Sequence, residues 1–182
     1  MMVFKNTEID LNSLHQAIID AIAAQFPTLQ TVVDYHDDRK TLRTPAVLVE
    51  LSDFEATPDD DPGTEQLAVL ARFEARIVIG FRTPNAEREI RKLAAALGVF
   101  IHMKRWGQPA GPAEVLTITP DTFEPDLDQF VVWRVEWQQP LHIGVSVWNN
   151  DGMIPIEVLL SYVPDIGPGN EEKYEPIDGV PE

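Results

Sequence analysis

The sequence predicts an α+β fold, in which two helices pack on one face of a mainly antiparallel sheet, followed by an extended C-terminal arm. Two segments carry apolar residues at three- and four-residue steps, which is typical of amphipathic helices. Two longer segments, residues 66–82 and 129–143, alternate apolar and polar residues, which indicates half-buried strands. Strands at hairpin-like spacing with only two helices favour an antiparallel sheet over a doubly wound one.

The first helix is predicted over residues 10–26. Asp10 or Asn12 can cap its N-terminus, and Pro27 ends it because proline cannot continue a helix. Its apolar stripe consists of Leu11, Leu14, Ile18, Ile22 and Phe26.

Three short segments follow this helix. An apolar piece at residues 31–33 leads into a polar loop at 37–40. Residues 45–54 are predicted to form a strand with Pro45 at its first position, where a missing N–H is tolerated. Residues 56–63, rich in Asp and Pro, indicate an acidic turn.

Residues 66–82 carry the clearest alternation in the chain. One face holds Leu67, Val69, Ala71, Phe73, Ala75, Ile77, Ile79 and Phe81. The other face holds Gln66, Arg72, Glu74, Arg76 and Arg82. This pattern predicts one long, half-buried antiparallel strand. Because a usual strand has about 5–6 residues, we expect this one to bend or to extend beyond the domain body.

The second helix is predicted to start at Thr83, as the cap residue, with Pro84 in the first helical position. It runs to about residue 104, and Gly107 and Pro109 mark its end. Its apolar stripe consists of Ala86, Ile90, Leu93, Ala94, Leu97 and Ile101.

Two further strands are predicted, over residues 113–119 and 129–143. Trp133 and Trp137 share one face of the second, which indicates core packing, with an interface as the alternative. Pro140 indicates an edge position or a bulge near it, since proline cannot donate to a strand ladder.

The composition changes after Gly144, so we divide the chain into a domain at residues 1–144 and an acidic arm at residues 145–182. The arm has five prolines, four glycines and eight acidic residues against the single base Lys173. It is too polar to fold alone, apart from one strand-like piece at residues 156–162. Apolar side chains are nevertheless spaced along it: Trp148, Met153, Leu159, Leu160, Tyr162 and Tyr174. This spacing predicts an arm that becomes ordered against a partner.

Charge and composition exclude several function classes. The 182 residues suffice for one domain with a core. A net charge of -16 opposes binding to nucleic acid phosphates and to anionic membranes. The absence of cysteine removes disulfides and thiolate metal sites. We expect no signal peptide and no membrane span, because the sequence has no apolar run of the required length.

No catalytic, cofactor-binding or metal-binding signature is found, so we do not expect an enzyme. The histidines stand alone in separate elements: His15, His36, His102 and His142. Residues 59–61 are three aspartates that suit a hard cation, but the spacing of a calcium loop is missing and a solvated loop explains them more simply. Pro164-Asp165 followed by Glu171-Glu172-Lys173 superficially matches a metal-dependent nuclease pattern. An acidic metal-dependent hydrolase or nuclease therefore stays as an alternative.

The second helix carries the main basic feature, Arg88, Arg91 and Lys92. These side chains can pair with Glu87 and Glu89 along the helix. Alternatively they accept an acidic neighbour, which in so acidic a protein includes a second copy of the chain. We predict an interface that comprises Arg88, Arg91, Lys92, Trp148, Leu160, Tyr162 and Tyr174.

Two segments resemble the tail terminator and related neck proteins of contractile-tailed, Mu-like bacteriophages. They are residues 132–144 (VWRVEWQQPLHIG) and residues 160–174 (LSYVPDIGPGNEEKY). The order of the predicted elements agrees with that of these proteins over most of the chain, whereas the amino-acid sequence itself is similar chiefly in these two segments. The smallest members of this group lack the long arm.

The resemblance implies a virion protein that assembles in the host cytoplasm and is not an enzyme. Such proteins form a hexameric ring on the last ring of the tail tube, stop its polymerisation and present a surface to the head connector. In contractile tails they also touch the tail sheath protein. Another neck or baseplate-proximal virion protein is the alternative within the same structural class. Neither implies specific nucleic acid binding or a membrane.

Overall fold

The computed structural model of the chain describes residues 9–35, 42–121, 130–147 and 159–176. The chain divides into two compact units, residues 1–147 and 148–182. The sequence placed the boundary three residues earlier, after Gly144. Each unit is considered by itself below.

The first unit contains one five-stranded sheet in the order β1-β2-β3-β5-β4. All neighbouring pairs are antiparallel except β1 and β2, which run parallel. The α+β class with a mainly antiparallel sheet is therefore confirmed, although the sequence did not predict the parallel pair. The strands are β1 (Thr31–Asp34), β2 (Ala46–Ala56), β3 (Leu67–Gly80), β4 (Glu114–Pro120) and β5 (Phe130–Ile143).

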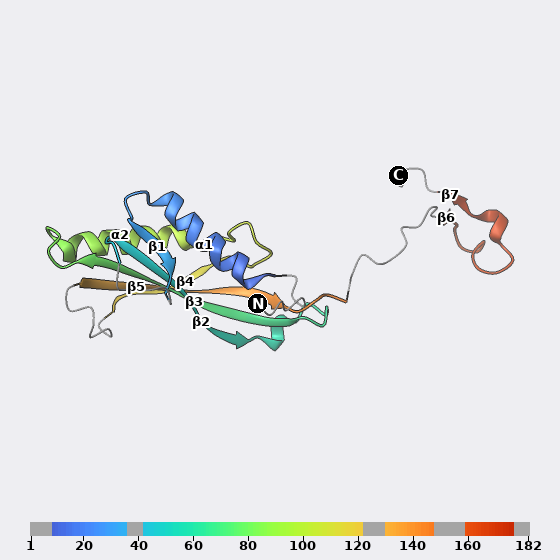
Figure 1. Cartoon of the computed structure of the whole chain (residues 1–182). Coiled ribbons are helices and arrows are strands. Elements are labelled where there is room, and N and C mark those ends of the chain that lie inside the picture. The colour runs from blue at the N-terminus through green and yellow to red at the C-terminus, as the bar shows by residue number, and fades with distance from the viewer. Residues whose placement is uncertain (1–8, 36–41, 122–129, 148–158, 177–182) are drawn as a thin grey trace, which may run out of the picture. The chain divides into compact units, whose positions relative to one another are not determined.

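Both helices, α1 (Leu11–Gln25) and α2 (Ala86–Ile101), cover the same face of this sheet (Figure 1). The predicted start of α2 was wrong. Its N-cap is Asn85, which adopts a left-handed backbone with φ of 58°. Asparagine is among the few residues that adopt this conformation readily. Thr83 instead closes a tight turn, because its carbonyl accepts a hydrogen bond from the Ala86 N–H at 3.1 Å.

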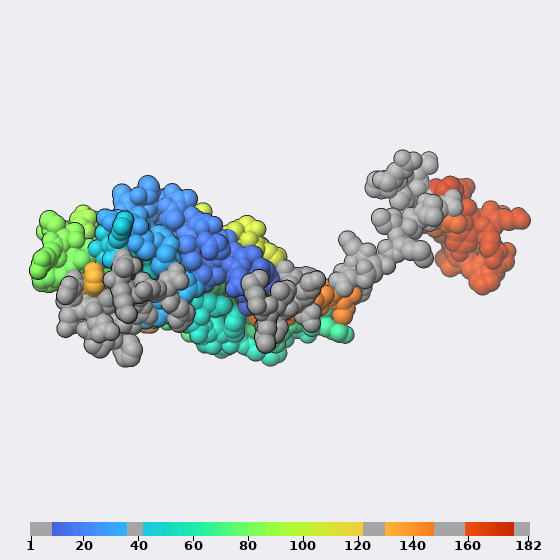
Figure 2. All heavy atoms as spheres, in the orientation of Figure 1, coloured from blue at the N-terminus to red at the C-terminus, as the bar shows by residue number. Residues whose placement is uncertain are grey.

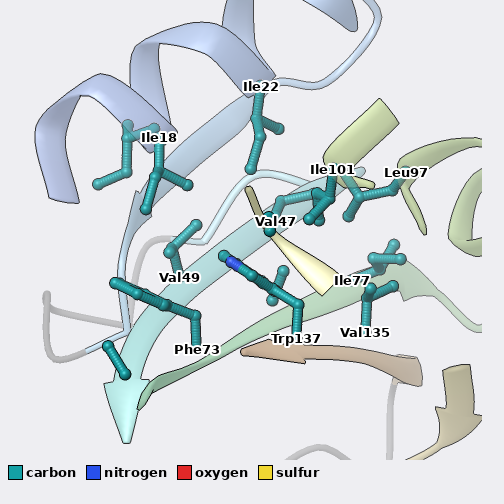
Figure 3. Packing of buried hydrophobic residues seen from close by; sticks show 14 of the residues in the cluster. Ile18, Ile22, Val47, Val49, Phe73, Ile77, Leu97, Ile101, Val135 and Trp137 are labelled. Carbon is teal, nitrogen blue, oxygen red and sulfur yellow. The ribbon is translucent and has the colours of Figure 1, made fainter. Parts of the chain in front are cut away.

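The core lies between the helices and the sheet. Phe73 on β3 and Trp137 on β5 stack with their ring centroids 5.3 Å apart and their planes at 10°. Figure 3 places both rings beneath residues from α1 and α2, including Ile18 and Leu97. The interpretation of Trp137 as a core residue is confirmed, while Trp133 is only partly buried.

β3 and β5 each have 14 residues and pair over their whole length, from Leu67 opposite Ile143 to Gly80 opposite Phe130. β3 therefore does not run past its partner strand. The expectation that it bends or extends beyond the domain body stays a prediction. β2 has a bulge between Leu51 and Asp53, and β4 has one between Val115 and Thr117, opposite Trp137 and Glu136 of β5.

Pro140 lies in β5, which is an inner strand and not an edge strand. Its carbonyl accepts a hydrogen bond from the Gly111 N–H at 2.8 Å. In a strand the N–H and C=O of one residue face the same side, so the missing N–H also faces this side. β4 begins to pair only at Gln138, and no ladder bond is therefore lost at Pro140. A side chain at position 111 would lie only 2.8 Å from this ring, which explains the glycine.

Asp10 caps α1, as the sequence predicted. Its carboxylate accepts hydrogen bonds from the Ser13 hydroxyl at 2.8 Å and from the Asn12 N–H at 3.0 Å. The Ser13 bond, followed by the Asn12 bond, holds the pKa of Asp10 below its ordinary value. A carboxyl with a depressed folded pKa stabilises the fold above its unfolded pKa of about 3.9, and this contribution is lost as the pH falls through the folded value.

We therefore expect Asp10→Asn, which keeps the cap but cannot titrate, to be less stable than the wild type at neutral pH. The difference is expected to close as the pH falls below about 4. Urea midpoints of both proteins, measured across this range, test the expectation. A difference that does not change with pH would contradict it, and Asp10→Ala serves as the control that loses the cap at every pH.

Candidate interaction surfaces

The residues considered for metal or acid–base chemistry do not come together. Among the described residues, no three His, Asp or Glu side chains are grouped so that they could hold a metal ion. His102 and His142 are exposed, and His36 lies outside the described ranges. The aspartates at 59–61 are exposed on and next to a short 3-10 turn, where Asp61 accepts a hydrogen bond from the Gly63 N–H.

His15 lines a cleft of about 550 Å³ on the first unit, between α1 and the β1–β2 edge of the sheet. Its Nε2 lies 3.0 Å from Oδ2 of Asp34, which with Glu50 makes the cleft's charged lining mainly acidic. The remaining lining residues are Leu11, Asn12, Gln16, Ile19, Val32, Val33 and Leu51.

The helix-free face of the sheet is held together by charge at its centre. Arg76 donates to Glu50 at 2.5 Å and to Asp121 at 3.1 Å, and it lies 2.7 Å from an oxygen of Glu74. The guanidinium also stacks over the Tyr35 ring, 4.1 Å from its centroid. The side chains of Arg76, Glu50, Glu74 and Asp121 are only 11–19% exposed. These side chains therefore bind one another and are poorly accessible to a partner.

The basic residues of α2, in contrast, are open to solvent. Arg91 lies 3.7 Å from Glu87 and Lys92 lies 2.8 Å from Glu89, with both basic side chains more than 60% exposed. The predicted pairing along the helix is thus confirmed for these two residues. Exposed pairs contribute about 0–1 kcal/mol, so the pairs leave Arg91 and Lys92 available to another acidic group. Arg88 is exposed as well.

Large apolar side chains continue this exposed surface of α2. Val99 is 80% exposed and Met103, just beyond the helix, is 63% exposed. The sequence analysis did not select them, although an apolar residue on the polar side of a helical pattern was a usable signal. β4, which forms one edge of the sheet, adds Leu116 and Ile118 at 38% and 37% exposure.

The second unit contains a small closed loop, which we call the C-terminal lobe and define as residues 159–176. Strands β6 (Leu159–Leu160) and β7 (Glu175–Pro176) pair antiparallel and bring its ends together. Figure 2 shows the lobe in red as one compact group of atoms. Within the segment predicted as an extended arm, these residues therefore fold back on themselves.

Two residues for which the sequence suggested other roles, an interface residue and a possible metal ligand, form hydrogen bonds inside the lobe. The Tyr174 hydroxyl accepts from the Gly167 N–H at 2.9 Å, so this half-buried tyrosine serves the lobe's own structure. Both carboxylate oxygens of Glu171 accept from the Gly169 N–H at 3.0 Å, which holds the pKa of Glu171 below its ordinary value. Glu171 thus orders a loop, whereas the nuclease pattern would have used it as a metal ligand.

The outer surface of the lobe is apolar and acidic. Its exposed large apolar side chains are Leu159, Leu160, Tyr162, Val163 and Ile166, with exposed fractions from 44% to 79%. Leu160 and Tyr162 were predicted as interface residues, and both are accessible. Trp148, also predicted, lies outside the described residues. The lobe has four carboxylates and one lysine, so an apolar surface is combined with net negative charge.

Comparison with known proteins identifies no relative: no family model matches the chain, and no curated protein matches it significantly. In the part of the chain that the structure describes, no helix is both long and apolar enough to cross a membrane.

Proposed function

We propose that this chain is a structural subunit of a phage tail neck, a tail terminator whose copies close into a ring, and that the ring is a hexamer, as the resemblance given above implies. The observation that carries the proposal is the C-terminal lobe, which exposes five large apolar side chains on only 18 residues. Contiguous exposed apolar surface on a small element is typical of a protein–protein contact. A docking element of this kind suits a subunit that functions by assembly.

A ring follows from the asymmetry of such a contact. If the lobe of one subunit binds a different surface on the next, the contact is head-to-tail, and head-to-tail contacts that close produce rings. The net charge of -16 supports the same role. An acidic channel repels the phosphate backbone, so DNA would pass through without adhering.

The resemblance of residues 132–144 and 160–174 to tail terminators and neck proteins supplies the rest of the proposal. In this proposal, the ring caps the tail tube protein, contacts the tail sheath protein and presents a surface to the head connector. Residues 132–144 form most of β5, an inner strand of the sheet, and residues 160–174 form most of the lobe. The resemblance therefore covers one segment that shapes the domain and one that is exposed.

Assembly and tail length test this proposal. We expect rings in negative-stain micrographs when the full chain is mixed with tail tube protein, and tails of uncontrolled length when the chain is absent from infected cells. Limited proteolysis is expected to cut within residues 145–182 in the free subunit and not in the ring. Tails of normal length without the chain, or full protection of this segment in a proven monomer, would overturn the proposal.

The double variant Leu160→Ser with Tyr162→Ser addresses the lobe directly. It removes two exposed apolar side chains that make no core contact in the described structure, so the domain is expected to fold as before. We expect at least a tenfold weaker assembly, which corresponds to about 1.4 kcal/mol. Val145→Ser with Val147→Ser is the matched control, since both valines are exposed but precede the lobe.

A further inference from the structure

We infer that the C-terminal lobe of one subunit docks on the outward surface of α2 and the adjoining β4 edge of a second copy. This inference rests on the proposed ring and names its contact. The acceptor begins with a row of side chains that we call the α2 stripe: Arg88, Lys92, Ala95 and Val99. Steps of four, three and four residues place them on one side of the helix, and all four are exposed.

Charge complementarity selects this surface. Six of the fourteen Lys and Arg residues fall between residues 82 and 105, where only Glu87 and Glu89 are acidic. This region therefore has a surplus of four positive charges in a chain of net charge -16. The lobe has four carboxylates against Lys173. Opposite charges of this kind align two surfaces and disfavour wrong partners.

Apolar complementarity selects the same surface. Val99 completes the stripe, and Met103 follows it at the end of the helix. Ile118 of β4 packs against Gly98, where an added Cβ would lie 2.6 Å from the Ile118 side chain. The exposed Ile118 therefore adjoins α2 at Gly98, and the exposed Leu116 lies two residues before it in β4. Together they offer an apolar strip next to basic side chains, which matches the apolar and acidic surface of the lobe.

The sheet edge can add backbone hydrogen bonds. β4 is the last strand of the sheet, and alternate residues of an edge strand direct their N–H and C=O groups away from their partner strand. An extended segment can pair with such groups, and this is a recurring mode of peptide recognition. β4 carries one charged residue, Glu114, while a bulge between Val115 and Thr117 and the terminal Pro120 restrict pairing to a short stretch of this edge.

The cleft between α1 and β1 is the competing acceptor, and its charge argues against it. Its charged lining consists of Asp34, Glu50 and His15, so it has no Lys or Arg to attract the carboxylates of the lobe. The helix-free face is disfavoured because its central charges are mutually paired and only 11–19% exposed.

Charge reversal with rescue tests the inference in the full chain. Arg88→Glu with Lys92→Glu is expected to weaken ring assembly at least tenfold, and so is Glu172→Lys with Glu175→Lys in the lobe. Combining the four substitutions is expected to restore most of the assembly. The helix should still fold, because Arg88→Glu places an acidic side chain near its N-terminus, where negative charge is favourable. Circular dichroism of each variant checks this.

The chain's lack of cysteine allows a second readout without background. A Val99→Cys variant mixed with a Val163→Cys variant is expected to form disulfide-linked dimers under oxidation when rings are present. Ala24→Cys, on the exposed side of α1, replaces Val99→Cys as the control and is expected not to cross-link. In the double variant, covalent multimers support docking on a second copy, and a cross-link within one chain overturns it.

The outcomes separate this contact from the proposed function. Rings that form normally in both charge-reversed variants would overturn the α2 acceptor while leaving the proposed ring intact. Weakened assembly that the combined variant does not restore would overturn it as well. A wild-type chain that forms no ring with tube protein under any condition would overturn the proposed function itself.

Discussion

Trp137→Ala is expected to lower the free energy of unfolding of the domain by about 4 kcal/mol, the middle of the range for a large aromatic core residue. Trp137 is fully buried, and it stacks on Phe73 at 5.3 Å under both helices. Its removal leaves a cavity that four elements would have to collapse together to fill. It also removes the aromatic stacking, which contributes about 0.5–1.5 kcal/mol beyond area burial.

Urea denaturation followed by far-ultraviolet circular dichroism measures this loss without relying on tryptophan fluorescence. Trp133→Ala is the matched control, because Trp133 lies on the same strand and the same face but is only partly buried. We expect it to cost about half as much, since cavity cost scales with the buried volume removed. Equal losses in the two variants would contradict the assigned difference in packing.

The sequence predicted the elements of the domain because one face of its sheet is buried along nearly its whole length. The alternation from Val69 to Ile79 in β3 follows directly from that burial. β1 has only four residues, which are too few to show either the two-residue alternation of a strand or the 3.6-residue repeat of a helix. Its parallel pairing with β2 was therefore not predictable. The prediction of where α2 starts was wrong for a different reason, since Thr83-Pro84 is compatible both with a helix N-terminus and with the tight turn that forms.

The candidate surfaces were predictable where a single residue's chemistry is enough. Leu160 and Tyr162 stand out in a polar segment, and both are exposed. The inward role of Tyr174 depends on a hydrogen bond to Gly167, which no spacing rule provides. The charge cluster around Arg76 joins residues 26 and 45 positions away in the sequence. Such pairs follow from strand order and register, which the alternation within one strand does not reveal.

Arg76→Met is expected to destabilise the domain by about 3 kcal/mol, the lower end for breaking a buried charge pair by removing one partner. Methionine keeps the stem of the side chain but leaves Glu50, Glu74 and Asp121 without their shared cation. Burial opposes the charged form of Arg76, but the hydrogen bond to Glu50 and the charge of Glu74 outweigh it, so the pKa of the guanidinium lies above its ordinary value. The cation is therefore held firmly in the folded state.

Arg72→Met is the matched control for this prediction. Arg72 lies on the same face of β3 and contacts Glu55 at 2.9 Å and Glu136 at 3.8 Å, but its side chain is 36% exposed against 15% for Arg76. Water and salt screen exposed pairs, so we expect a much smaller loss, which high salt reduces further. Comparable losses in both variants would contradict the role assigned to burial.

A second substitution identifies the origin of the loss at Arg76. If the cost comes from mutual repulsion of carboxylates that have lost Arg76 on a poorly hydrated face, then adding Glu50→Gln to Arg76→Met should recover part of it, since one such charge is gone. If the cost came from lost packing of the arginine stem, the second substitution would recover nothing. Chemical denaturation of the single and double variants at neutral pH separates these cases, because only the first explanation predicts that the added substitution recovers stability.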